Sequence, residues 1–247
     1  MDGHLRTLSF TLWVEHRVIE SMCLERRSPP ARCDVERNDS VELVLVRHAE
    51  PDRAAAGPAR ANPGLSDRGR EQAARAADYL AAEDFAALYT SPLIRAVDTA
   101  DIIGKAVGLT PVTRADLAEF DRDAVEYLHF EDLRVNNDPR YEAFLRDDLS
   151  AWGTDVPSFR KRVTAEFDRI IDAHPGERVL VVSHGGVANA FIGGLVGASR
   201  LTIHEPGYTG FARIRAGRTR RTLVSLNETP HLRGFDLGIR AVRTQGA

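Results

Sequence analysis

The chain has 247 residues, of which 43% are hydrophobic, and this suits one α/β domain with a sizeable core. Its formal net charge of −3 argues against nucleic acid as a partner, because nucleic-acid-binding domains usually carry a marked basic excess. The only two cysteines, Cys23 and Cys33, lie near the N-terminus, which excludes a disulfide framework and a cysteine-based zinc site in the rest of the chain.

The first part of the chain differs in composition from the rest. Residues 1–39 contain Pro29-Pro30, mixed charges and no sustained period, so we expect a poorly ordered extension. No apolar segment approaches the roughly 20 residues that span a bilayer, and no signal-peptide cleavage site is visible. We therefore expect a cytoplasmic protein without a membrane partner. The folded domain is expected at 40–235, followed by a tail at 236–247.

Regular patterns begin at residue 41. The β-branched, apolar run at 41–46 predicts a buried strand. Residues 49–64 are rich in Ala, Pro and Gly and are expected to form a loop, after which Ser66 is expected to cap a helix over 67–82. The next predicted elements are, in order, a strand at 86–89, a helix with Ser91 as N-cap and Pro92 as first residue that reaches Gly108, and a strand at 111–114.

The second half of the chain continues the alternation. After an acid-rich, irregular or helical segment at 116–150, the pattern predicts a helix from Pro157 to about 173, a strand at 178–182, a helix at 185–196, and late strands at 209–214 and 222–226. Strands that alternate with helices indicate βαβ units. The predicted fold class is therefore α/β, with a mostly parallel central sheet covered by helices on both faces. The 116–150 segment is expected to be a small insertion over the active site.

Three predicted strands end in residues that suit phosphate chemistry. These residues are Arg47 and His48 after the first strand, Arg95 one turn into the helix after the second, and His184 with Gly185 after the strand at 178–182. The carboxyl ends of parallel strands meet at one edge of a sheet, where ligands of α/β proteins bind. The sequence therefore predicts that two arginines, two histidines and a serine converge there.

This residue set has a clear chemical logic. Arginine offers forked donors that match phosphate oxygens, and a glycine at a helix start can present backbone N–H groups. A neutral imidazole can attack phosphorus and form a phosphohistidine that water then hydrolyses. We expect nearby cations to lower the pKa of His48 and keep it neutral, while His184 stays protonated and helps to neutralise the transition state.

Six segments also resemble, in order along the chain, the motifs of the histidine phosphatase, or phosphoglycerate mutase-like, superfamily. They are LVRHAE at 45–50, LSDRGREQA at 65–73, SPLIRAVDTA at 91–100, LAEFD at 117–121, SHGG at 183–186, and Asn227 with His231-Leu232. One such motif is weak evidence, whereas a full ordered set is strong. The resemblance implies a three-layer α/β sandwich and an enzyme that needs neither a metal nor another cofactor.

The resemblance also implies individual roles. His48 is the expected phosphorylated nucleophile, and Arg47, Arg95 and His184 complete the phosphate pocket. Glu119 is the expected acid for the leaving group, with Asp121 and Glu126 as alternatives, because the sequence departs from the family pattern after Asp121. Two further departures are Ala49, which replaces the usual glycine and is tolerated if its φ is negative, and Ala54, which replaces an asparagine of many members.

The leading functional hypothesis is a phosphatase that hydrolyses a phosphomonoester of a small metabolite. A phosphoglycerate mutase is the main rival, and the acid-rich 116–150 segment counts against it, since it suits capture of a second phosphate poorly. A protein phosphohistidine phosphatase and a non-catalytic phosphate-binding module are further alternatives. A small phosphorylated substrate is the expected partner, and a homodimer is allowed. Tyr208 suits either substrate contact or strand packing.

Overall fold

The computed structural model describes residues 39–53, 61–217 and 220–235, which all belong to the unit that starts at Asn38. The predicted extension up to residue 38, the predicted tail at 236–247 and Ala54 lie outside the described residues. Six strands form one sheet in the order β3-β2-β4-β1-β5-β6. Their bounds are β1 Val41–Arg47, β2 Ala87–Thr90, β3 Val112–Thr113, β4 Arg178–Ser183, β5 Phe211–Ala216 and β6 Arg221–Glu228.

Strand direction confirms the predicted α/β class. Neighbouring strands in the β3-β2-β4-β1 part of the sheet run parallel, whereas β5 pairs antiparallel with β1 and β6 pairs antiparallel with β5. The two late strands were predicted at 209–214 and 222–226, and the corresponding β5 and β6 begin and end within a few residues of these bounds. The carboxyl ends of β1, β2 and β4 therefore meet at one edge of the sheet, as the site hypothesis requires.

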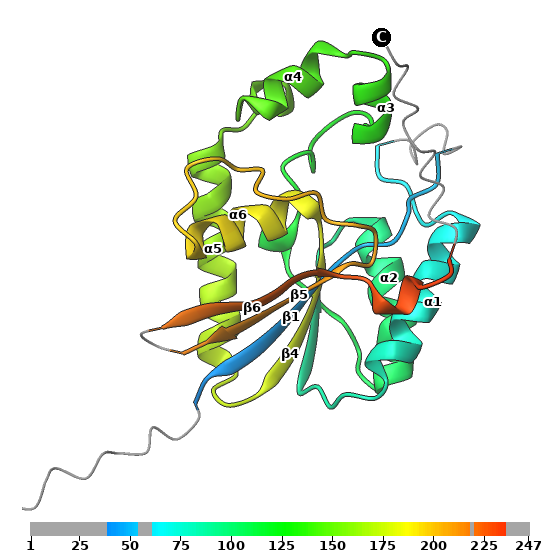
Figure 1. Ribbon diagram of the computed structural model, residues 1–247, viewed down its shortest axis with the longest axis vertical. Helices are drawn as coiled ribbons and strands as arrows, with labels where there is room; N and C mark the ends of the chain where they lie inside the picture. Colours follow the sequence, from blue (N-terminus) through cyan, green and yellow to red (C-terminus); the bar gives the residue numbers. More distant parts are fainter. Residues whose placement is uncertain (1–38, 54–60, 218–219, 236–247) are drawn as a thin grey trace, which may run out of the picture. The chain divides into compact units, whose positions relative to one another are not determined.

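Helices cover both faces of the sheet, as predicted (Figure 1). Leu43 and Leu45 of β1 point to a core shared with α5 (Val156–Ala173) and α6 (Gly185–Leu195). Val44 and Val46 point to the other core, which α1 (Asp67–Leu80) and α2 (Ile94–Val107) close. Alternate residues of a strand face opposite sides, so a strand buried on both faces reads as an unbroken apolar run.

The start of α2 corrects a prediction. Ser66 caps α1 as expected, since its side chain accepts a hydrogen bond from the Gly69 N–H. In contrast, α2 begins at Ile94 and not at Pro92, and the side chain of Asn62 accepts a hydrogen bond from the Ile94 N–H at 2.9 Å. Leu93, and not Ser91, is the N-cap residue of α2; the Ser91 hydroxyl accepts a hydrogen bond from the Leu93 N–H at 3.2 Å and also contacts the ring of His184.

The 116–150 segment contains short helices. They are η2 Ala115–Leu117, α3 Phe130–Val135, α4 Pro139–Leu145 and η3 Ser150–Trp152. The ring of Phe120 packs against Phe130, Phe144 and Trp152 of this segment and against Phe159 of α5. This aromatic cluster attaches the segment to the main core. The chain ends its described part with η4 (Pro230–Leu232), which packs near α1.

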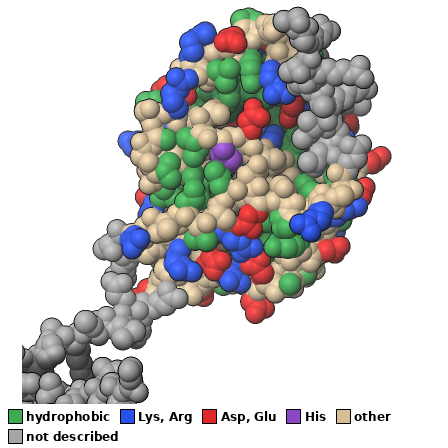
Figure 2. Space-filling view, in the orientation of Figure 1, with side chains coloured by type: hydrophobic (Ala, Val, Ile, Leu, Met, Phe, Trp, Pro, Cys, Tyr) green, Lys and Arg blue, Asp and Glu red, His purple; other side chains and the backbone are tan. Residues whose placement is uncertain are grey.

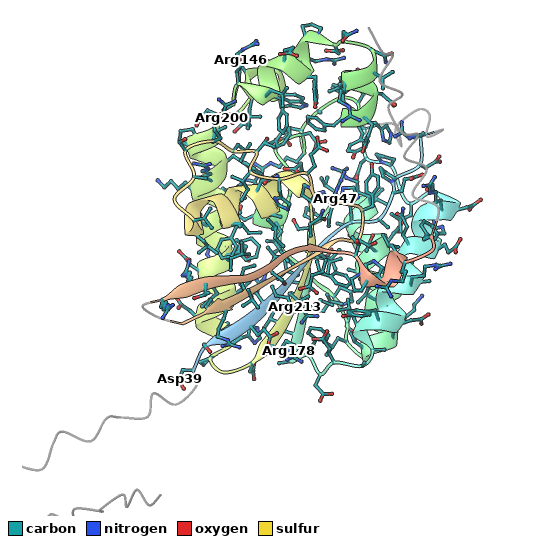
Figure 3. All side chains as sticks on the ribbon, in the orientation of Figure 1. Asp39, Arg47, Arg146, Arg178, Arg200 and Arg213 are labelled. Atoms are coloured by element: carbon teal, nitrogen blue, oxygen red, sulfur yellow. The ribbon has the colours of Figure 1, made fainter. Side chains whose placement is uncertain are left out.

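An ion-pair network joins strands at the end of the sheet opposite the predicted site. The Arg213 guanidinium contacts both carboxylate oxygens of Glu83, and Arg178 pairs with Glu42 and Glu83. Figure 3 shows Arg178 and Arg213 close together and well separated from Arg47. This network therefore belongs to the scaffold. Of the helices in the described part of the chain, none is both long enough and apolar enough to span a lipid bilayer.

Gly69 allows α1 to approach the loop after β1, and its replacement is expected to destabilise the fold. A Cβ atom at Gly69 would lie 2.0 Å from the Glu50 carbonyl oxygen, which is backbone and cannot rotate away. Gly69→Ala should therefore lower the free energy of unfolding by at least about 2 kcal/mol, a typical cost of overpacking. Urea denaturation checks this value.

Gly194→Ala is the matched control for Gly69→Ala. Gly194 also lies in a helix, but it is exposed, and a Cβ there would meet nothing within 4 Å. Alanine should stabilise the protein at that position by about 0.5–1 kcal/mol, since glycine is a poor helix former. A Gly69→Ala protein as stable as the wild type would contradict the close approach of α1 to Glu50.

Candidate active site

His48 follows the last residue of β1 and is buried at the sheet edge, with 2% of its surface exposed. Its Nδ1 lies 2.8 Å from the carbonyl oxygen of Ala49. A carbonyl can only accept a hydrogen bond, so Nδ1 carries the hydrogen and Nε2 keeps its lone pair. Burial lowers the pKa of His48 well below its ordinary value, and Arg95 and Arg47 lower it further. The ring is therefore neutral and can act as a nucleophile through Nε2.

The backbone after His48 is held by α2. The Ala49 N–H donates to the hydroxyl of Thr99, which in turn donates to the Arg95 carbonyl oxygen at 2.7 Å. Ala49 is not among the residues with positive φ, so its Cβ is accommodated, as the sequence predicted for this departure from the family pattern. Thr99 thus fixes the loop of His48 relative to the helix that carries Arg95.

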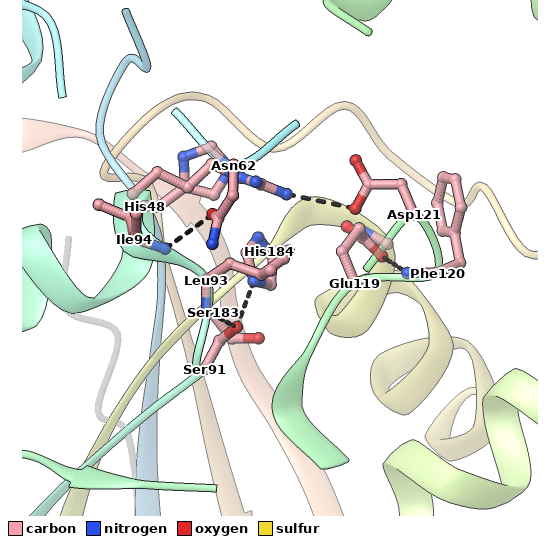
Figure 4. A network of polar contacts seen from close by, with 12 residues as sticks. His48, Asn62, Ser91, Leu93, Ile94, Glu119, Phe120, Asp121, Ser183 and His184 are labelled. Carbon is pink, nitrogen blue, oxygen red and sulfur yellow. Dashed lines mark hydrogen bonds and ion pairs between the residues drawn. The ribbon is translucent and has the colours of Figure 1, made fainter. Parts of the chain in front are cut away.

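His184 lies opposite His48, with 5.1 Å between the ring centroids. Its Nε2 is 2.6 Å from the Ser91 hydroxyl, which leaves Nδ1 on the other side of the ring (Figure 4). Burial lowers the pKa of His184 well below its ordinary value, and the charge of Arg95 lowers it further. The direction of this shift favours the neutral form of His184, contrary to the protonated state predicted from the sequence.

Arg47 and Arg95 supply the positive charge of the pocket. Arg47 donates to the Pro206 carbonyl oxygen at 2.6 Å, and Arg95, only 1% exposed, contacts Asp121 at 3.3 Å. Within the described residues, several buried nitrogens lack a hydrogen-bond partner, namely Nε of Arg47, Nε and Nη1 of Arg95, and Nδ1 of His184. Buried donors of this kind suit an anion that brings several acceptor oxygens, as a phosphoryl group does.

Two glycines start α6 beside these cations. Gly185 is the first residue of the helix, and a Cβ there would lie 3.8 Å from Nε of Arg47. Helix N-termini favour anions, because their first N–H groups are unpaired within the helix. At Gly186 a Cβ would lie 2.3 Å from Oε1 of Glu119, so only glycine allows that carboxyl group to approach.

Glu119 lies at the same edge, on the 116–150 segment (Figure 4). Its carboxyl group accepts hydrogen bonds from the Gly186 N–H at 2.8 Å and the Phe120 N–H at 3.1 Å. Burial and, to a smaller extent, the charge of Asp121 raise the pKa of Glu119 to about 7. Such a carboxyl group can both donate and accept a proton near neutral pH.

The two alternative acids have different surroundings. Asp121 contacts Arg95 at 3.3 Å, and although burial raises its pKa, the neighbouring guanidinium offsets part of this rise. Glu126 lies 3.8 Å from Arg140 and is 31% exposed. Glu119 is the carboxyl group that contacts the start of α6 directly, and its pKa is raised to about 7.

Two tyrosines stack on the two arginines; the sequence offered Tyr208 as a substrate contact or a packing residue and did not single out Tyr127. The guanidinium carbon of Arg47 lies 4.1 Å from the ring centroid of Tyr208, and that of Arg95 lies 4.3 Å from the ring centroid of Tyr127. Cation–π contacts of this kind restrict an arginine to one plane. Neither tyrosine belongs to a recognisable motif, so only the fold brings them to the arginines.

Two other contributors were missed for the same reason. Ser91 was interpreted as a helix cap, but its hydroxyl orients His184. Arg162, from the middle of α5, donates to the carbonyl oxygens of Asp116 and Glu119 and so supports the segment that carries the carboxyl group. Arg162 reads as an ordinary charge on a helix face, and no signal in the sequence distinguishes it.

Comparisons with known proteins agree with this geometry. Residues 43–229 match the family model of the histidine phosphatase superfamily, branch 1. Phosphoglycerate mutase-like protein 4 of Arabidopsis thaliana is 34% identical over 165 residues, which cover 64% of this chain and 72% of that protein. The metal-independent phosphoserine phosphatase of the same plant is 32% identical over 161 residues, or 62% of this chain and 68% of that protein.

A solved structure with the same fold comes from Entamoeba histolytica. It is a mutant phosphoserine phosphatase in complex with phosphoserine, 25% identical to this chain, with a TM-score of 0.63. The superposition covers 78% of this chain and 99% of that one. The two proteins therefore share the same overall fold.

Proposed function

Because the chain belongs to branch 1 of the histidine phosphatase superfamily, we propose that it is a metal-independent phosphatase that hydrolyses a phosphomonoester of a small metabolite. The observation that carries this proposal is the state of His48, which is buried between two arginines, is neutral, and has its Nδ1–H bound to a carbonyl oxygen. A histidine in this state can attack phosphorus through Nε2.

In the first proposed step, Nε2 of His48 forms a bond to phosphorus while the bond from phosphorus to the ester oxygen breaks. The leaving alkoxide takes the proton of Glu119, whose raised pKa allows it to be protonated near pH 7. The phosphoryl oxygens are bound by four groups, which are the side chains of Arg47, Arg95 and His184 and the backbone N–H of Gly185. The same groups stabilise the charge of the transition state.

The second proposed step releases phosphate. Water attacks the phosphohistidine, and the ionised Glu119 accepts one of its protons, so that the bond from phosphorus to Nε2 breaks. His48 returns to its neutral form and Glu119 to its protonated form, and the cycle is complete. One carboxyl group thus acts first as an acid and then as a base, which requires a pKa near the working pH.

The pH dependence of hydrolysis tests the role of Glu119. For an alkyl phosphomonoester, kcat/KM should fall as the pH rises through about 7, because the leaving group then loses its proton donor. On the acidic side, His48 stays neutral well below its ordinary pKa, so the nucleophile is retained there. The substrate also ionises near pH 6. Comparison of the pH profiles of the wild type and Glu119→Gln separates ionisation of the carboxyl group from ionisation of the substrate. An alkaline decline shared by both proteins would contradict the assignment of Glu119 as the acid.

A mutase activity is the main alternative. Residues 120–157 include the acidic side chains Asp121, Asp123, Glu126, Glu131, Asp132, Asp138, Glu142, Asp147 and Asp148. Among these, the Glu131 and Asp132 carboxylates pair with Arg53. Figure 2 shows acidic and basic side chains interspersed on the visible face, which supports a small substrate over nucleic acid. Because an acidic segment repels a second phosphate group, it disfavours the mutase reaction and supports hydrolysis.

One assay distinguishes the two activities. Purified protein is incubated with 3-phosphoglycerate, with phosphoserine and with p-nitrophenyl phosphate, and both free phosphate and 2-phosphoglycerate are measured. Phosphoserine is included because relatives carry the name phosphoserine phosphatase. We expect phosphate release to exceed isomerisation. Faster formation of 2-phosphoglycerate than of phosphate would establish the mutase instead, and no turnover of any ester would favour a phosphate-binding module.

A further inference from the structure

The hydroxyl group of Tyr208 is buried and has no hydrogen-bond partner within the described residues. Most buried hydroxyl groups in proteins are hydrogen-bonded, so an unpaired one needs an explanation. The ring of Tyr208 stacks on Arg47 at 4.1 Å, and its centroid lies 5.8 Å from that of His48. The unpaired donor therefore belongs to a residue in direct contact with the phosphate pocket, and it takes no part in the two steps described above.

The groups around Tyr208 leave its hydroxyl protonated. Burial raises the pKa of Tyr208, and of the charged side chains nearby Arg47 lowers it while Glu131 raises it. Glu131 belongs to α3, and Arg53 pairs with it from the loop after β1. The hydroxyl thus keeps its proton at working pH and can donate a hydrogen bond to a ligand held beside Arg47 and His48.

The backbone next to Tyr208 is held in an unfavourable conformation. Thr209 has a φ of 54°, which is rare for a β-branched residue. Its N–H donates to the Arg47 carbonyl oxygen at 3.1 Å, and its hydroxyl lies 2.9 Å from Nε2 of His231. Such strain persists only where surrounding contacts enforce it, and it concentrates at functional sites.

The preceding residues are fixed as well. The side chain of Asn227 accepts a hydrogen bond from the Gly207 N–H at 2.8 Å, and Pro206 accepts one from Arg47. Asn227 and His231 belong to the last of the six segments that resemble the family motifs, so this segment has a structural role. It holds the turn that carries Tyr208 against the end of β1.

We propose that Tyr208 determines specificity, in that its hydroxyl donates a hydrogen bond to a polar group on the alcohol half of the substrate. This inference rests on the proposed function, because it assumes that His48 and the arginines hold the phosphoryl group. The substrate class is then the phosphomonoester of a small alcohol with a hydroxyl, carbonyl or carboxylate oxygen near the ester. An ester with an apolar alcohol half leaves the hydroxyl unpaired.

Comparison of Tyr208→Phe with the wild type tests this inference, because phenylalanine keeps the ring over Arg47 and removes only the hydroxyl. The substrates are phosphoserine, 3-phosphoglycerate and glycerol 3-phosphate, with p-nitrophenyl phosphate as the ester that lacks a polar group near the phosphate. For the best polar ester, kcat/KM should fall about ten-fold, mainly through KM, which corresponds to one neutral hydrogen bond. For p-nitrophenyl phosphate it should stay within about two-fold of the wild type.

Tyr79→Phe is the matched control, since Tyr79 is 40% exposed and lies on α1. It should leave the kinetics of every ester unchanged. An equal loss of activity on all esters, or no loss on any, would overturn the assignment of Tyr208. Failure of the proposed function looks different, because the wild type would then hydrolyse none of the esters, including p-nitrophenyl phosphate.

Discussion

Replacement of His48 by alanine is expected to lower kcat for every phosphomonoester by at least about 10³-fold, because it removes the nucleophile on which both chemical steps depend. The remaining pocket still has Arg47, Arg95 and His184, so binding of inorganic phosphate or vanadate should survive. Steady-state kinetics with p-nitrophenyl phosphate measures the first effect, and calorimetric titration with vanadate measures the second. Loss of activity with retained binding separates the missing nucleophile from a misfolded pocket.

His174→Gln is the matched histidine control. His174 precedes β4, whereas His184 follows that strand. The ring of His174 contacts Tyr89 and Glu177 outside the pocket. This variant should keep wild-type kcat, although its stability can change. If His48→Ala retained more than about one tenth of the wild-type activity, His48 would not be the nucleophile, since removal of a nucleophile is far more damaging.

Glu119→Gln is expected to have an effect that depends on the leaving group. Hydrolysis of an alkyl ester such as glycerol 3-phosphate should slow by about 10²–10⁴-fold, the usual contribution of a general acid. Formation of the phosphohistidine from p-nitrophenyl phosphate should change far less, because p-nitrophenolate leaves without a proton. The alkaline decline in kcat/KM should also disappear with the carboxyl group, whose pKa of about 7 produces it. Stopped-flow measurement of p-nitrophenolate release isolates this first step.

The two alternative acids provide the controls. Asp121→Asn removes the partner of Arg95 and should change KM for all esters alike, regardless of the leaving group. Glu126 lies beside Arg140, and Glu126→Gln should leave kcat and KM nearly unchanged. A leaving-group effect in either of these variants, with none in Glu119→Gln, would transfer the role of the acid to that residue.

The sheet edge was predictable from the sequence, because it depends on local signals. An unbroken apolar run, as at 41–46, predicts a strand buried on both faces, and the end of that strand places Arg47 and His48. The apolar run at 178–182 likewise predicts the strand that ends before His184. Ser66 was also predictable as a helix cap, since its partner, Gly69, is three residues away.

Features that depend on distant contacts could not be predicted. Ser91 has the local signature of a helix cap, but in the fold its hydroxyl is bound by His184, which is 93 residues away. The protonation state of His184 depends on burial and on Arg95, neither of which a motif reveals. Tyr127 and Tyr208 reach the arginines from two irregular segments, so their role follows only from the three-dimensional arrangement.

Direct detection of a phosphohistidine on His48 tests the central claim most directly. The protein is mixed with radiolabelled substrate, quenched within milliseconds in alkali, which preserves phosphohistidine, and digested for peptide mass spectrometry. We predict one phosphoryl group on Nε2 of His48, formed and lost at rates that match turnover, and absent from His48→Ala. Phosphate release without any phosphorylated protein, or with the label on another residue, would contradict the account.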